Sequence, residues 1–151
     1  MSVFCVYLNA ETVMVSLVND DGAAYIGGER NRLASALVEG AMEVFFQANH
    51  IVFDLGLPSD EEDVLPDRKT AALIARIGGA AYLLDVRAGA PVGDEGPPEY
   101  LAYDFVDLIT DEIISTGVVR KTEIDTEVAD SLTLCLLLGE KVAAGAVATL
   151  K

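Results

Sequence analysis

Two neighbouring stretches of the sequence decide the fold. The first, ARIGGAAYLLDVRAG (residues 75–89), contains the end of a helix, two adjacent glycines and then an apolar, β-prone run. The second, PEYLAYDFVDLITDEIISTG (residues 98–117), contains two β-prone runs joined by a short polar turn at Thr110–Glu112. Together they predict a helix, a strand and an antiparallel hairpin, in that order along the chain.

The sequence before these stretches alternates β-prone and helical segments. Three strands are predicted, in VFCVYL (3–8), TVMVSLV (12–18) and HIVFDL (50–55), from their runs of valine, isoleucine and aromatic residues. Apolar residues spaced three or four apart predict a helix from Glu29 to Asn49. A second helix is predicted with Pro66 in its first turn. It is expected to stop at Gly78 and Gly79.

The segment after the hairpin predicts a last helix. Thr126 is the expected N-cap, and the helix is predicted to reach Leu150. Alternating strands and helices followed by antiparallel strands are typical of an α/β (α+β) fold, here a single mixed sheet with a C-terminal antiparallel hairpin and about three helices packed on it. The length of 151 residues fits one domain, residues 1–151, and no repeat or long linker divides it.

Composition limits the classes of partner. Ten basic and twenty-five acidic residues give a net charge of −15, which repels phosphate backbones, so nucleic acid is not expected as a partner. The most apolar stretch, Leu132–Leu138, is too short to span a bilayer, and no transmembrane segment is expected. The N-terminus has no basic region before its apolar run, so no signal peptide is expected in this chain.

Few residues suit catalysis. His50 is the only histidine, no serine or cysteine lies near it in sequence, and a capping or surface role is expected for it. Cys5 and Cys135 form no CxxC pair, and both are expected to be buried free thiols. The acidic run Asp60–Asp67 lacks the glycine and terminal glutamate of a calcium loop. We therefore expect no enzyme activity, no cofactor and no metal site.

The two opening stretches resemble the TolB N-terminal domain and the LpoB and CsgG type of envelope lipoproteins. In those families a helix that ends in an Ala-Arg-x-x-Gly-Ala pattern leads into a tyrosine-containing strand, and the next hairpin turns within a Leu-Val-Asp-x-x-Thr-Gly-Glu pattern. The matching positions here are Ala75, Arg76, Gly79, Ala80, Tyr82, Val106, Asp107, Thr110 and Glu112. Asp111 replaces the usual turn glycine, and Asp85 stands where those families often have a glycine or a neutral residue.

The resemblance implies a scaffold and a broad role. Those families work in the bacterial envelope by docking other proteins, so it implies a protein-binding or assembly module in the periplasm or cell envelope. The alternative is a small ligand- or metal-binding domain or enzyme, in which the acidic loop 60–67 and the glycine-rich segment 20–28 line a cleft at the strand ends.

The last helix is the candidate interface. It is apolar nearly all round, and leucines one or two apart on a helix point to different sides, so they cannot all contact one sheet. Gly139, Ala143, Gly145 and Ala146 are small enough to admit a second helix. Core burial within the chain and contact with a partner, or with a second copy, are both compatible with this pattern. The partner-interface candidates are Leu132, Leu134, Leu136, Leu137 and Leu138.

Overall fold

The computed structural model describes residues 11–18, 28–55, 65–89, 97–124 and 130–150. Its elements follow the predicted order of strands and helices. They are β1 (Thr12–Leu17), α1 (Gly28–Gln47), β2 (Ile51–Asp54), α2 (Arg68–Ile77), β3 (Tyr82–Ala88), β4 (Tyr100–Asp107), β5 (Glu112–Arg120), a short 3-10 helix η1 (Lys121–Glu123) and α3 (Ser131–Val147). The predicted strand at residues 3–8, with Cys5, lies outside the described residues.

One five-stranded sheet has the order β2-β1-β3-β4-β5. β1 pairs in parallel with both β2 and β3, and the β3–β4 and β4–β5 pairs are antiparallel. The sheet is therefore mixed, with a C-terminal hairpin and three α-helices, and the predicted fold class is confirmed.

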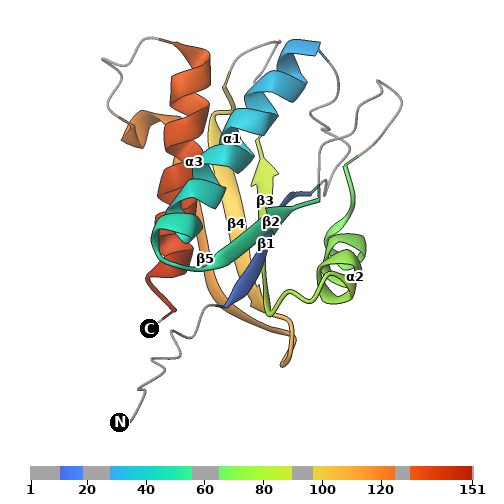
Figure 1. Cartoon of the computed structure of the whole chain (residues 1–151). Coiled ribbons are helices and arrows are strands. Elements are labelled where there is room, and N and C mark those ends of the chain that lie inside the picture. Colours follow the sequence, from blue (N-terminus) through green and yellow to red (C-terminus); the bar gives the residue numbers. More distant parts are fainter. Residues whose placement is uncertain (1–10, 19–27, 56–64, 90–96, 125–129, 151) are drawn as a thin grey trace, which may run out of the picture.

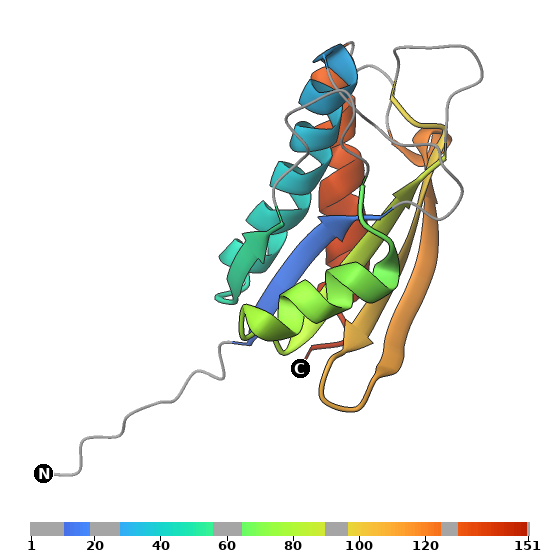
Figure 2. The same ribbon diagram turned by 90° about the vertical axis from the view of Figure 1, so that its right-hand side faces the viewer.

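The helices divide between the two faces of the sheet (Figures 1 and 2). α1 and α3 pack side by side on one face, where α1 contacts β1 and β2 and α3 contacts β4 and β5. α2 lies alone on the other face, over β3. Strand residues alternate between the two layers: Val13 and Val15 belong to the larger core under α1 and α3, whereas Met14 belongs to the smaller core under α2.

Two glycines allow α1 and α3 to approach closely. A Cβ atom on Gly40 would lie 2.1 Å from the backbone oxygen of Leu136, and one on Gly139 would lie 2.0 Å from the backbone oxygen of Leu37. Each glycine thus receives the backbone of the opposite helix. For Gly139 the helix that the small residue was expected to admit is α1 of the same chain, whereas Gly145 faces the side chain of Tyr103.

Helix ends differ in part from the predictions. Asp67, not Pro66, precedes the first helical residue of α2, and its side chain accepts a hydrogen bond from the Thr70 amide at 2.7 Å. α3 begins at Ser131 with Asp130 as its N-cap, so the predicted start at Thr126 was wrong; Thr126 itself lies outside the described residues. A carboxylate at the N-cap satisfies an otherwise unbonded amide, which explains both starts.

The turns follow the predicted chemistry. Gly79 has a φ of 80° directly after α2, and Asp111 has a φ of 63° in the β4–β5 turn. Asp107 Oδ1 accepts hydrogen bonds from the amides of Ile109 at 2.9 Å and Thr110 at 3.2 Å. No helix within the described residues is long and apolar enough to cross a membrane.

The glycine contact between α1 and α3 predicts that replacing either glycine by alanine lowers stability, although helix propensity alone predicts that alanine raises it. Alanine is the better helix former, yet Gly139→Ala or Gly40→Ala would press a methyl group into the backbone of the other helix. Overpacking of this kind costs about 1–3 kcal/mol. Urea unfolding should show that loss for both variants and little change for Ser35→Ala on the exposed side of α1. Unchanged or raised stability would show that the helices separate without cost.

The cap of α3 predicts a pH-dependent contribution to stability. Hydrogen bonds from the backbone amide and then the hydroxyl of Thr133 lower the pKa of Asp130 below its ordinary value of 3.8. A carboxyl whose pKa is lower in the folded state stabilises above its unfolded pKa, and this contribution is lost as pH falls through the folded value. Asp130→Ala should therefore melt at a lower temperature than the parent at pH 7, and the difference should shrink below pH 3.8.

Glu39→Ala is the matched control for the cap. Glu39 is an exposed acid in the middle of α1, where every amide already has a helical partner. Differential scanning calorimetry across this pH range should show no such pH-dependent difference for Glu39→Ala. A deficit for Asp130→Ala that stays constant down to the lowest pH would contradict a role for the ionised carboxylate.

Candidate functional site

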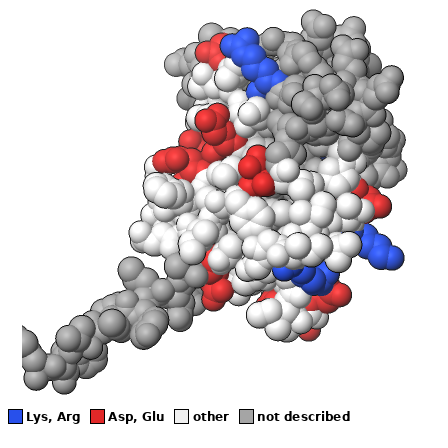
Figure 3. All heavy atoms as spheres, turned by 45° about the vertical axis from the view of Figure 1, so that its right-hand side comes forward, with Lys and Arg blue, Asp and Glu red and all other residues white. Residues whose placement is uncertain are grey.

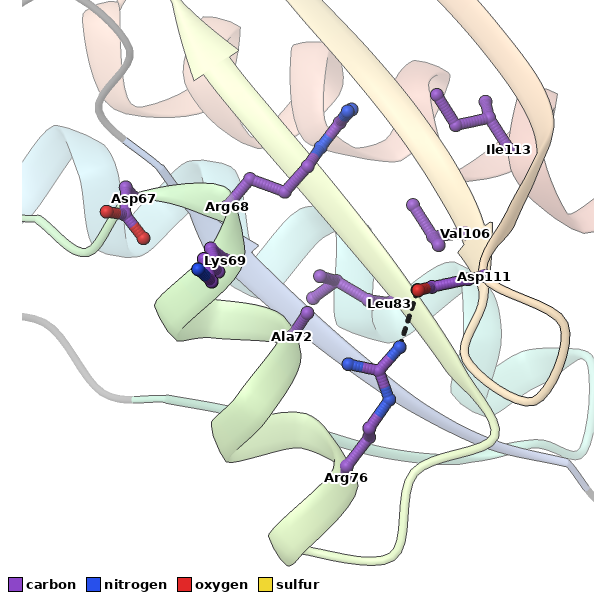
Figure 4. A pocket seen from close by; sticks show the side chains of 9 residues that line it. All are labelled: Asp67, Arg68, Lys69, Ala72, Arg76, Leu83, Val106, Asp111 and Ile113. Atoms are coloured by element: carbon purple, nitrogen blue, oxygen red, sulfur yellow. Dashed lines mark hydrogen bonds and ion pairs between the residues drawn. The ribbon is translucent and has the colours of Figure 1, made fainter.

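The face of the sheet that carries α2 is only partly covered. α2 lies over β3, and β4 and β5 extend beyond it to the right in Figure 2. Between α2 and this open part is a hollow of about 630 Å³ (Figure 4). Its lining residues are Asp67, Arg68, Lys69, Ala72 and Arg76 of α2 and its cap, together with Leu83, Val106, Asp111 and Ile113 of the strands and hairpin turn.

Aliphatic side chains form the floor and the far side of the hollow. Leu83 is fully buried and Val106 is 7% exposed, whereas Ile113 on β5 is 51% exposed. Ile113 is paired with Val106 and therefore lies on the same face of the sheet. Further along β5, Val118 is paired with Ala102 on this face and is 50% exposed. We call the part of this face formed by β4 and β5 the open face.

Two buried carboxylates lie beside the hollow. Asp85 on β3 and Asp104 on β4 are register partners, and they are 0% and 7% exposed. Arg68 extends from the first turn of α2 and binds both, with its Nε 2.5 Å from Asp85 Oδ2 and its terminal nitrogen on Asp104 Oδ2. A buried carboxylate is stable only when it is paired, so this arginine fixes the start of α2 against the sheet.

A second arginine and a threonine complete this charge cluster. Arg87 Nη2 lies 2.9 Å from Asp104 Oδ2, and its Nε lies 3.7 Å from Asp85 Oδ1. The Thr116 hydroxyl on β5 donates to Asp104 Oδ1 at 2.6 Å. Both arginines keep part of their side chains exposed, so the cluster lies at the boundary between core and solvent. Its two cations balance its two anions. The cluster therefore holds together the helix and strands that carry these residues.

The other end of α2 is fastened to the hairpin turn. Arg76 donates to the Leu108 carbonyl at 3.3 Å and to Asp111 Oδ1 at 2.5 Å (Figure 4). Arg76 is a motif position of the first opening stretch, and Asp111 lies in the turn of the second. The two motifs that suggested the resemblance therefore meet in space, as a contact between the helix end and the hairpin.

The predicted interface leucines divide into three environments. Leu138 is fully buried in the core with Cys135. Leu132 and Leu134 are half-buried and pack against that core. Leu136 and Leu137 are also half-buried. Leu138 thus packs within the chain, and partner contact by the other leucines stays a prediction.

Of the other residues considered from the sequence, Asp67 at the end of the acidic loop lines the hollow, and His50 and Cys135 lie outside it. His50 precedes β2, where its ring contacts Phe45 edge-on with the centroids 6.4 Å apart. Cys135 is a free thiol in the core, and burial raises its pKa to about 12. Most of the acidic loop and of the glycine-rich segment 20–28 lie outside the described residues. In the described part of the chain, no group of three or more His, Cys, Asp or Glu residues is arranged to hold a metal.

Sequence reasoning missed the charge cluster. Asp104 and Asp107 are three apart on one strand and therefore lie on opposite faces, and the register agrees, because Asp104 is paired with Asp85 and Asp107 with Tyr82. Sequence reasoning did not ask what would neutralise an aspartate in an apolar strand. That question would have led to Arg87, two residues after Asp85 and on the same face of β3.

The charge cluster predicts different effects for two neighbouring cations of α2. Arg68→Met leaves two buried carboxylates with Arg87 alone, and should cost about 3 kcal/mol, the low end for breaking a buried pair. Lys69 makes no ion pair with any described residue, so Lys69→Met should change stability by less than about 0.5 kcal/mol. Urea unfolding of both variants gives the comparison. Equal effects would show that Arg68 does not hold α2.

The chain was compared with known proteins by sequence. No protein-family model matches it. Adenine deaminases from Paraburkholderia phytofirmans and Paraburkholderia xenovorans are each 32% identical to it over 114 residues. The match covers 72% of this chain and 31% of each enzyme, so the chain spans less than a third of the length of these relatives.

Solved structures give a fuller alignment. PelC from Paraburkholderia phytofirmans, solved as a dodecamer, aligns with 91% of this chain and 88% of its own at a TM-score of 0.51 and 13% identity. TolB from Acinetobacter baumannii aligns with 94% of this chain and 28% of its own, at 0.46 and 11% identity. The C-terminal domain of LpoB from Salmonella enterica aligns with 74% of this chain and 83% of its own, at 0.46 and 22% identity.

TolB and LpoB, which the sequence motifs suggested, are thus both among the solved structures similar to the chain. Of these three structures, PelC is the one that aligns with a TM-score above 0.5. The chain therefore has the fold of a PelC subunit.

Proposed function

We propose that this chain is a protein-binding or assembly module of the bacterial cell envelope, that it catalyses no reaction, and that it docks its partner on the open face. The observation that carries the proposal is the open face itself. It presents half-exposed aliphatic side chains beside a hollow, on a chain otherwise rich in charge.

The exposed aliphatic side chains lie at two places along β5. Ile113 and Val118 lie on one face of the strand with Thr116 between them, and Ile114, at an irregularity of the β4–β5 register, is 36% exposed. Exposed apolar side chains beside polar residues are common at interaction sites. Here the polar residues are Lys69 and Arg76 of α2, and the underlying sheet is held rigid by the charge cluster.

Apart from Lys69, the charged side chains that line the hollow are engaged by other described groups. Arg68 and Arg87 neutralise the two buried aspartates, and Arg76 pairs with Asp111. A general acid or base needs a group that is free to exchange a proton with a substrate, and a nucleophile needs activation. The Cys135 thiol, with a pKa of about 12 in the core, is neither ionised nor accessible at neutral pH.

Two further observations favour an envelope assembly role. The motif resemblance implies families that dock proteins in the bacterial envelope. PelC, whose fold the chain shares, was solved as a dodecamer. Within the proposal, α3 remains a second candidate surface, through the half-buried Leu136 and Leu137.

The alternative is a small ligand- or metal-binding domain or an enzyme. The sequence similarity to adenine deaminases favours it, and the hollow is large enough for a small ligand. Native mass spectrometry of the purified protein would reveal a bound metal or ligand. Release of ammonia from adenine, above that of heat-treated protein, would contradict the non-catalytic proposal.

Capture of a partner tests the docking surface. Ile113→Glu places a charge on the open face, and because Ile113 is half-exposed the fold should persist. Immobilised parent protein should retain a specific protein from an envelope extract of the source organism, and Ile113→Glu should retain at least tenfold less. Ser35→Glu, on the exposed side of α1, makes the same charge change and should bind like the parent. Equal retention by all three would place docking elsewhere.

A further inference from the structure

The border of the sheet at β5 presents backbone groups that no described strand pairs with. Resting on the proposed function, we infer that the partner docks by adding an extended segment of its own chain to this border, antiparallel to β5. The occupant is a segment of a different protein, rich in β-branched residues, with a basic residue at the end that meets Glu112. The length of β5, the direction of its backbone groups and its charge support this inference.

The two borders of the sheet differ in length. β2 at one border has four residues, whereas β5 at the other has nine (Figure 2). Very short border strands and border prolines are two of the means by which proteins keep other chains from pairing there. β5 contains no proline, and its register with β4 is irregular only at the Phe105/Val106 step. Its regular part, residues 115–120, is long enough to pair with another strand.

The hydrogen bonds at the end of β5 show which of its backbone groups face outward. The Lys121 amide donates to the Glu99 carbonyl at 2.9 Å, so these two residues form a hydrogen-bonded pair of the antiparallel ladder. Such pairs alternate along a ladder with pairs that exchange no backbone hydrogen bonds. Counting back from Lys121, the backbone groups of Arg120, Val118 and Thr116 point away from β4.

The Arg120 amide confirms this direction. It donates to Glu123 Oε2 at 2.9 Å, so it does not face β4. Glu123 thereby occupies that end of the border. The outward N–H and C=O groups of Thr116 and Val118 have no partner among the described residues. An antiparallel strand would bond to both residues, because they are two positions apart, as the bonded positions of a ladder are.

The same residues present their side chains on the open face. Thr116 is paired with Asp104 of the charge cluster and Val118 with Ala102, and Ile113 lies on this face as well. Side chains of an added strand alternate between the two faces, so every second one would lie beside Val118 and Ile113 and cover them in part. Strand addition therefore uses both the unpaired backbone and the half-exposed aliphatic side chains of β5.

Charge favours a basic segment of another protein over a second copy. Each copy carries −15, so copies repel one another and attract a basic partner. On the face seen in Figure 3, acidic side chains gather over α1 and β2. At the border itself, Glu112 is exposed and makes no ion pair with a described residue. A lysine or arginine opposite it would form a favourable cross-strand pair.

Three synthetic peptides test this pairing. The probe is Thr-Val-Thr-Val-Thr-Val-Lys, acetylated and amidated so that its ends are uncharged, and its lysine meets Glu112 when it runs antiparallel to β5. The first control, Thr-Val-Thr-Pro-Thr-Val-Lys, has the same charge but lacks the central amide hydrogen. The second control replaces the lysine by glutamate.

Nuclear magnetic resonance titration gives the comparison. The probe should shift the amide signals of Thr116 and Val118 and slow their hydrogen exchange. The proline peptide should bind about tenfold more weakly, because it cannot donate to β5 at its centre. The glutamate peptide should bind about fivefold more weakly, because like charges oppose each other across a strand pair.

A pair of variants at Val118 makes the same test on the protein. Val118→Pro removes one outward amide and leaves the bonds to β4, since proline is tolerated on a border strand where its nitrogen faces solvent. It should bind the probe about tenfold more weakly, whereas Val118→Thr keeps the amide and should bind like the parent. If Val118→Pro unfolds, the proline peptide tests the same backbone bond with the parent protein.

Three results would overturn the inference. One is equal binding of the probe and the proline peptide, because side chains alone would then explain the contact. Another is the absence of any shift in β5 at millimolar probe. The last is a parent that dimerises in sedimentation velocity and becomes monomeric with Val118→Pro, which would assign the border to a second copy.

The capture experiment separates the failure of this inference from that of the proposed function. Loss of retention with both Ile113→Glu and Val118→Pro supports both. Loss with Ile113→Glu but not with Val118→Pro would keep the docking surface and remove strand addition. Retention that neither variant changes would remove both.

Discussion

Two aspartates in the middle of an apolar sheet impose the constraint on which the arrangement of this face depends. Asp85 and Asp104 face each other across β3 and β4, where an unpaired charge would be too costly to retain. Arg68 supplies the countercharge from α2, so the helix must begin where its side chain reaches both carboxylates. α2 is thereby held over β3, and it cannot also cover β4 and β5. The open face is the consequence of this placement.

The same constraint gives the two faces of the sheet different roles. Under α1 and α3 the sheet is sealed by aliphatic side chains and by backbone contacts at Gly40 and Gly139, which leave no room for a partner. On the other side a ten-residue helix is fixed at both ends by arginines, through Arg68 to the strands and through Arg76 to the hairpin turn. A surface held in this way is preorganised, so little conformational entropy of this surface is lost when a partner docks there.

Local signals in the sequence were sufficient for the fold but not for the site. The order of elements, the turn at Asp107–Asp111 and the glycine after α2 follow from periodicity and turn chemistry, which act over a few residues. The start of α3 was placed too early because Thr126 and Asp130 are both good caps, and a cap signal alone does not rank them. Arg68 lies 17 positions before Asp85 and 36 before Asp104, and only the packing of α2 on the paired strands β3 and β4 brings the three together.

The contact between α1 and α3 also has a consequence for biosynthesis. Gly40 receives the backbone of Leu136, which is synthesised long after α1. Until then α1 has no helix beside it, and the apolar side chains of Leu33, Leu37 and Phe45 lack part of their cover. Contacts between such distant parts of a chain form slowly, and the exposed surface meanwhile invites aggregation. A nascent chain of this protein therefore cannot complete this contact before α3 has been synthesised, and until then it is a natural client for chaperones.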